Sequence, residues 1–78
     1  MSSVSKLLVL IGNHFNLRID EININSSKDD IDDWDSLEHI KLILHIESEF
    51  GVKFALETIP KITSIKLIQE ELGKLINE

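Results

Sequence analysis

The sequence is poor in several residue types, and each scarcity excludes a class of site. It has no cysteine, so the chain offers no disulfide, thiolate metal site or nucleophilic thiol of its own. The chain has only 8 Lys and Arg residues but 14 Asp and Glu residues, and the resulting formal charge of −6 disfavours nucleic acid and anionic membranes as partners. A positively charged protein surface is a better partner for such a chain.

Long apolar runs are also missing. The apolar run near the N-terminus, Leu7 to Ile11, is shorter than a secretory signal core or a membrane span, so we expect a cytoplasmic protein. The 78 residues predict one domain over positions 1–78 with one modest core, and we expect it to be a monomer. So short a chain leaves little room for an elaborate pocket, which argues against a stand-alone enzyme.

Apolar residues at helical spacing predict a first and a last helix. The first would end between residues 12 and 15, and the last would follow Thr63 or Ser64 as its N-cap. The apolar stripes are Val4, Leu7, Leu8, Ile11 and Phe15 in the first helix, and Ile65, Ile68, Leu72, Leu75 and Ile76 in the last.

A second helix is predicted from Asp35, at or near the N-cap, to Phe50, with Gly51 as its left-handed terminator. Leu37 and Leu44 lie at the border of its two faces, where they either form an apolar docking strip with a charged rim or widen the core face. The polar face holds Glu38, Lys41, His45, Ser48 and Glu49, and the apolar face holds Ile40, Ile43, Ile46 and Phe50.

The remaining segments read as connections. Residues 16–35 are rich in Asn, Ser and Asp, and they predict a long loop that sends apolar anchors into the core. Residues 55–59 predict one short helical turn that stops ahead of Pro60, because a residue before proline disfavours helix. With no strand pattern, the fold class is all-α: a small antiparallel bundle of three main helices plus one short helix. The loop anchors are Leu17, Ile19, Ile22, Ile24 and Ile31.

Ser36 allows two interpretations. It lies in the first turn of the second helix, where free backbone N–H groups and the helix dipole favour an anion, so a phosphate ester on its hydroxyl would be well placed. Judged on Asp-Ser-Leu alone, a serine at a helix start is also ordinary capping chemistry.

The residues assembled so far resemble the acyl carrier protein family over nearly the whole chain. The resemblance rests on Asp35-Ser36-Leu37 opening the second helix, on IESEFGVKF closing it, and on Ile62-Thr63-Ser64-Ile65 before the last helix. It implies that a phosphopantetheinyl transferase esterifies Ser36 with 4'-phosphopantetheine from coenzyme A. The thiol of that arm then carries acyl cargo as a thioester, so the reactive sulfur comes with the prosthetic group and the carrier itself is not an enzyme.

The resemblance also implies that the second helix is read by the transferase and by acyl-loading and acyl-transferring enzymes. Lys41 departs from the family pattern, because carriers of fatty acid biosynthesis usually have an acid there to meet basic partners. His39 and His45 are unusual too. The recognition residues carried over are Asp35, Leu37, Glu38, Lys41, Leu44 and Glu47.

Trp34 is a further departure, and it acts either as a core anchor or as a cargo contact. The Trp-Asp-Ser-Leu version looks more similar to stand-alone carriers of specialised pathways, such as polyketide, modified-sugar or aminoacyl routes. An aliphatic cargo would shelter in the Leu- and Ile-rich interior, whereas a small polar cargo would stay outside.

Three other interpretations compete with an acyl carrier. An enzyme would pair Ser36 with His39, or His39 with Asp35, as nucleophile and base, but no Gly-x-Ser-x-Gly elbow is present, and His39 falls on the apolar arc as a satisfied, partly buried histidine would. The aspartates of residues 29–35 do not fit a calcium-loop register, so we expect neither catalytic nor metal-ligating residues. An unmodified acidic helical interaction module would show the same bundle, and only a covalent group on Ser36 distinguishes the two.

Overall fold

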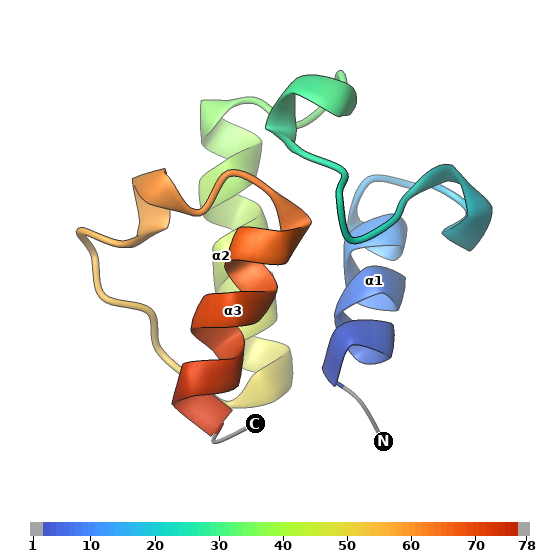
Figure 1. Ribbon diagram of the computed structural model, residues 1–78. Helices are drawn as coiled ribbons and strands as arrows, with labels where there is room; N and C mark the ends of the chain where they lie inside the picture. Colours follow the sequence, from blue (N-terminus) through green and yellow to red (C-terminus); the bar gives the residue numbers. More distant parts are fainter. Residues whose placement is uncertain (1–2, 77–78) are drawn as a thin grey trace.

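The computed structural model describes residues 3–76, and within them it contains three α-helices, three short 3-10 turns and no strand (Figure 1). The all-α fold class is confirmed. In chain order the elements are α1 (Ser3–His14), η1 (Ile19–Glu21), η2 (Lys28–Asp30), α2 (Ser36–Phe50), η3 (Ile59–Lys61) and α3 (Ile65–Ile76).

The helices enclose a single core. α1 packs against both α2 and α3, and it runs in the opposite direction to them (Figure 1). Nearly all side chains of the core are aliphatic, so apolar burial holds the bundle together without a disulfide. Its members are Leu7, Leu10, Ile11, Phe15, Ile22, Ile31, Trp34, Leu42, Ile43, Ile46, Phe54, Ile62, Ile65, Ile68 and Leu72.

The second helix begins and ends where the sequence predicts. The Asp35 carboxylate accepts the backbone N–H of Glu38 at 2.8 Å, which satisfies one free donor of the first turn. At the other end Gly51 adopts φ 66° and ψ 38°, and its N–H donates to the carbonyl of Glu47. This left-handed conformation stops the helix and is one that glycine adopts without steric cost.

The long loop is anchored as predicted, with one exception. Ile22, Ile31 and Trp34 are buried, whereas Ile19 lies in η1 and is exposed, because that turn projects from the bundle. Backbone hydrogen bonds also fasten the loop to the start of α3: the N–H of Lys28 donates to Thr63, and the N–H of Ile65 donates to Ser26. The loop is therefore a structured part of the domain that holds the entry to α2 in place.

The short turn after α2 lies later than predicted. It comprises Ile59–Lys61 and so includes Pro60, which the prediction placed beyond its end. Proline suits the first positions of a helical turn, because it has no N–H to leave unsatisfied and its φ is already helical. The prediction of Ser64 or Thr63 as cap of the last helix is confirmed for Ser64, whose hydroxyl accepts the N–H of Leu67 at 3.2 Å.

Candidate functional site

Ser36 is the first residue of α2, and its side chain is exposed to solvent. Asp35, not Ser36, makes the capping hydrogen bond. Within the described residues the Ser36 hydroxyl has no hydrogen-bond partner, so it is available for another reaction. The backbone N–H groups and positive end of the helix dipole surround this hydroxyl, and they favour a negatively charged substituent.

Three apolar side chains line the outer face of α2 below Ser36. Leu37, Ile40 and Leu44 are 63%, 53% and 58% exposed, at the spacing i, i+3 and i+7 that places them on one face. The two border leucines therefore face solvent. Ile40 was predicted on the buried side, and that prediction was wrong because the buried arc is centred instead on His39, Leu42, Ile43 and Ile46. We call Leu37, Ile40 and Leu44 the apolar strip.

Charged side chains beside the apolar strip are paired with one another. The carboxylate of Glu38 lies 3.4 Å from the ammonium of Lys41, one turn along α2, and 3.2 Å from Nε2 of His14 in α1. The Nδ1 atoms of His14 and His45 are 3.4 Å apart. These contacts offset part of the negative charge that Glu38 would otherwise present.

Glu47 faces the chain that follows α2. Its carboxylate accepts the backbone N–H of Phe54 at 2.8 Å, and its side chain is half-buried. This hydrogen bond helps to hold Phe54 in the core after the chain has turned at Gly51. Glu47 thus supports the connection between α2 and η3, and part of the Glu47 side chain remains exposed to solvent.

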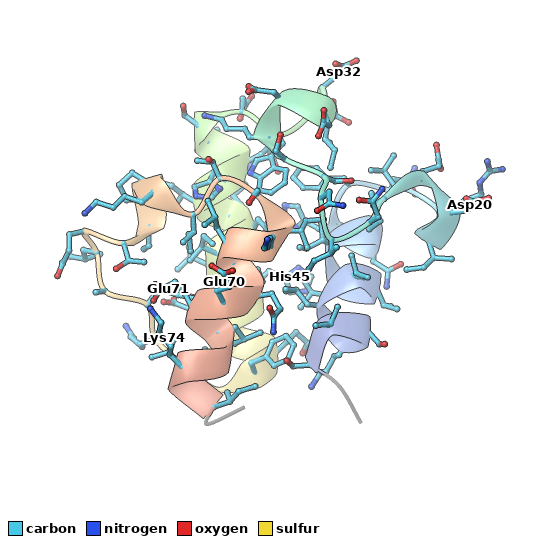
Figure 2. All side chains as sticks on the ribbon, viewed as in Figure 1. Asp20, Asp32, His45, Glu70, Glu71 and Lys74 are labelled. Atoms are coloured by element: carbon cyan, nitrogen blue, oxygen red, sulfur yellow. The ribbon has the colours of Figure 1, made fainter. Side chains whose placement is uncertain are left out.

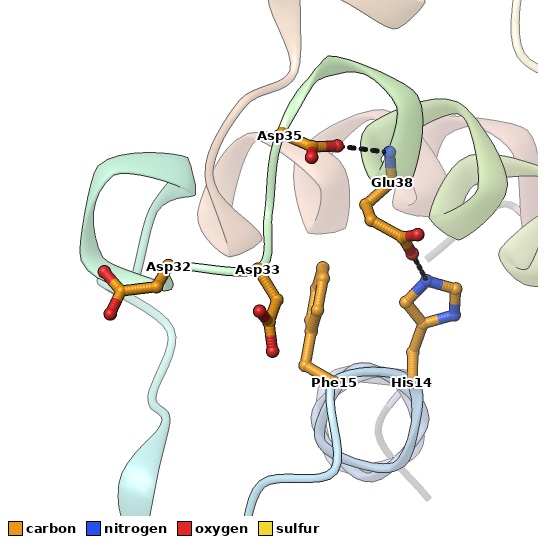
Figure 3. Close-up of a pocket in the computed structure, with 6 residues that line it drawn as sticks. All are labelled: His14, Phe15, Asp32, Asp33, Asp35 and Glu38. Atoms are coloured by element: carbon orange, nitrogen blue, oxygen red, sulfur yellow. Dashed lines mark hydrogen bonds and ion pairs between the residues drawn. The ribbon is translucent and has the colours of Figure 1, made fainter.

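A shallow pocket of about 390 Å³ opens next to the start of α2 (Figure 3). Four carboxylates line it, from the loop and from α2, together with two residues at the end of α1. Asp32 also points outward from the loop in Figure 2. His14 and Phe15 could not be placed here from sequence, because only the packing of α1 against α2 brings them to the site. The lining residues are His14, Phe15, Asp32, Asp33, Asp35 and Glu38.

Trp34 and His39 are buried together beneath Ser36. The Trp34 side chain is 2% exposed, and its indole N–H donates to Nδ1 of His39 at 2.9 Å. Nε2 of His39 lies 2.7 Å from the carbonyl of Ile59, which can only accept, so Nε2 donates to that carbonyl while Nδ1 accepts from the indole. The interpretations of Trp34 as a core anchor and of His39 as a satisfied buried histidine are confirmed.

These contacts occupy both ring nitrogens of His39, so neither is directed at Ser36. A serine nucleophile needs a base within hydrogen-bond reach, and His39 does not supply one here. Among residues 3–76 no three His, Asp or Glu side chains gather in a way that would hold a metal ion. None of the described helices is both long enough and apolar enough to cross a membrane.

Comparison with known proteins agrees with this geometry. No protein-family model and no curated protein matches the sequence. Among solved structures, a holo acyl carrier protein from Geobacter metallireducens, determined by solution NMR, superposes with a TM-score of 0.85 and is 27% identical. The match covers 99% of this chain and 88% of that one.

The fold is thus that of a small carrier protein, with three helices and an open serine at the start of the second. The predicted resemblance to the acyl carrier protein family is confirmed at the level of the fold, over almost the whole described length of the chain.

Proposed function

We propose that this chain is a cytoplasmic, non-catalytic carrier that holds acyl intermediates as thioesters on a 4'-phosphopantetheine arm attached to Ser36. The observation that carries the proposal is the exposed Ser36 hydroxyl, which has no hydrogen-bond partner among residues 3–76 because Asp35 caps the helix. The holo state named for the similar Geobacter metallireducens protein supports the same group here.

The residues present fit such an arm. The hydroxyl of Ser36 can accept a phosphoryl group without breaking any contact within the described fold, and the start of α2 stabilises a phosphodiester anion. When bound, the arm supplies a terminal thiol that the cysteine-free chain lacks. The chain's own contribution is placement: Asp35 fixes the first turn, and the buried Trp34 fixes the loop before it.

We assign partner recognition to the exposed face of α2. Leu37 and Leu44 supply apolar contact area, and Asp35, Glu38, Lys41 and Glu47 supply the charged rim. A small apolar strip with charges around it suits brief encounters with several enzymes in turn. The partners are a phosphopantetheinyl transferase and the enzymes that load and transfer the acyl group.

The Lys41–Glu38 ion pair favours a specialised pathway over fatty acid biosynthesis. It reduces the negative charge at the centre of the recognition face, where a basic partner would otherwise find an unpaired acid. Polyketide, modified-sugar and aminoacyl routes all need such a carrier, and an aminoacyl carrier would differ only in its loading enzyme.

The test is intact-protein mass spectrometry after incubation with coenzyme A, magnesium and a broad-specificity phosphopantetheinyl transferase. We expect a gain of one phosphopantetheine group on the wild-type chain and none on Ser36→Ala, which circular dichroism should show to be folded. A folded wild-type chain that gains no mass would instead support the unmodified interaction module.

A further inference from the structure

Three rings form a continuous layer beneath Ser36. Phe15 follows the end of α1, Trp34 lies two residues before Ser36, and His39 belongs to the first turns of α2. The ring centroids of Phe15 and Trp34 are 5.6 Å apart, and those of Trp34 and His39 are 5.9 Å apart and stacked. All three side chains are buried, with at most 6% exposed. We call them the aromatic layer.

The aromatic layer joins the end of α1, the loop before α2, α2 itself and η3. The contact of Phe15 with Trp34 fills the space between α1 and the loop, and the hydrogen bond from His39 to the Ile59 carbonyl bridges α2 and η3. A group tethered to Ser36 that entered the aliphatic core at either of these two places would have to displace a buried ring.

Opening the aromatic layer would be costly. Separating Trp34 from His39, or His39 from Ile59, leaves polar atoms buried without partners. Beyond the layer, large side chains of α2 and α3, such as Ile43, Ile46 and Ile68, are fully buried in the core. An alkyl chain that entered among them would have to push these side chains apart.

The space on the outside of the aromatic layer is polar. The pocket beside the start of α2 is lined by four carboxylates, those of Asp32, Asp33, Asp35 and Glu38, together with His14 and Phe15, so most of its lining is polar and offers little apolar shelter. We propose that this carrier keeps its cargo outside the bundle, and that the cargo is a short, polar acyl group rather than a long alkyl chain. This inference rests on the proposed attachment at Ser36.

The experiment compares carriers loaded with cargo of different length. A broad-specificity transferase would load Ser36 from acetyl-, hexanoyl- and decanoyl-coenzyme A, with mass spectrometry to verify each product. Because burial of an alkyl chain stabilises the folded state, a sheltered cargo raises the melting temperature as it lengthens. For the wild-type carrier we expect the same melting temperature with all three cargoes.

A double variant tests the role of the aromatic layer. Trp34→Leu with His39→Leu removes the hydrogen-bonded pair together, so that neither side chain leaves the other unpaired. In this variant we expect the melting temperature to rise with cargo length, on the order of 5 °C from acetyl to decanoyl. Phe50→Leu, an aromatic replacement at the far end of α2, is the matched control and should behave as the wild type does.

The fluorescence of Trp34 provides a second measurement on the same carriers, because Trp34 is the only tryptophan in the chain. Its emission maximum in the wild-type carrier should not change with cargo length, and this readout holds even if the double variant does not fold. A shift in emission or melting temperature with length in the wild type would overturn the inference alone. A folded double variant that is insensitive to length would overturn the role of the layer, and failure to load Ser36 would overturn the proposed function and this inference together.

Discussion

Single side chains near Ser36 have separate tasks. Asp35 makes the helix cap, which leaves the Ser36 hydroxyl without a partner in the described part of the chain, and His39 uses both ring nitrogens to join Trp34 to Ile59. The residue types alone did not show which of the two residues makes the capping hydrogen bond, since both Asp and Ser are good N-cap residues. The structure decides between them through one hydrogen bond of 2.8 Å.

Lys41 is the residue whose role is easiest to isolate. Lys41→Glu replaces its attraction to Glu38 with repulsion and exposes more negative charge on α2. We expect acyl transfer by a basic housekeeping fatty-acid-synthesis partner to speed up, with kcat/KM rising roughly 3- to 10-fold at low salt and less at high salt.

Lys74→Glu is the matched control for that substitution. Lys74 pairs with Glu71 at the same i, i+3 spacing and at 3.2 Å, but on α3 (Figure 2). Lys74→Glu changes the net charge by the same amount as Lys41→Glu. An equal rise in kcat/KM for both variants would therefore show that total charge matters rather than the position of Lys41. No gain for Lys41→Glu would contradict our account of the pathway.

At the scale of elements, the ends of α2 are set by local chemistry. Asp35 and Gly51 occupy the cap positions, and the apolar spacing between them favours a helix. The structure of the connecting segments depends on other features. The turn η3 forms around Pro60, and two backbone hydrogen bonds join the long loop to distant residues: the N–H of Lys28 donates to Thr63, and the carbonyl of Ser26 accepts from Ile65. Such partners cannot be inferred from local spacing.

The left-handed end of α2 gives a prediction about stability. A Cβ added at Gly51 would meet no atom within 4 Å, so the effect of Gly51→Ala comes from its positive φ alone. We expect the free energy of unfolding to fall by about 1–2 kcal/mol, measured by urea denaturation. Gly51→Asn should lose less, because asparagine tolerates this conformation. Equal stability of Gly51→Ala and wild type would show that the turn relaxes.

The whole molecule combines a strong negative charge with an exposed apolar strip. The formal charge of −6 opposes self-association, while Leu37, Ile40 and Leu44 favour it. The strip is narrow, so we expect repulsion to prevail and the protein to sediment as a monomer at low and at high salt. A dimer that appears when salt screens the charge, and is absent in Leu44→Ser, would contradict this prediction.

The sequence by itself determined the fold class, the extent of α2 and the position of Ser36, because periodicity, caps and terminating glycine act within a few residues of one another. It also identified Trp34 and His39 as unusual. The sequence put Ile40 on the buried face of α2, although its side chain is exposed, because exposure depends on which side of α2 the other helices cover.

Only the tertiary structure decided how the site is surrounded. His14 reaches it from α1, Phe15 from just after α1, and Ile59 reaches His39 from η3, across 19 or more residues of chain. Such contacts depend on how whole helices pack, and no local pattern encodes them. The packing of α1, α2 and η3 thus buries Phe15, Trp34 and His39 together near the start of α2, while the short motif around Ser36 indicates only where an arm would be attached.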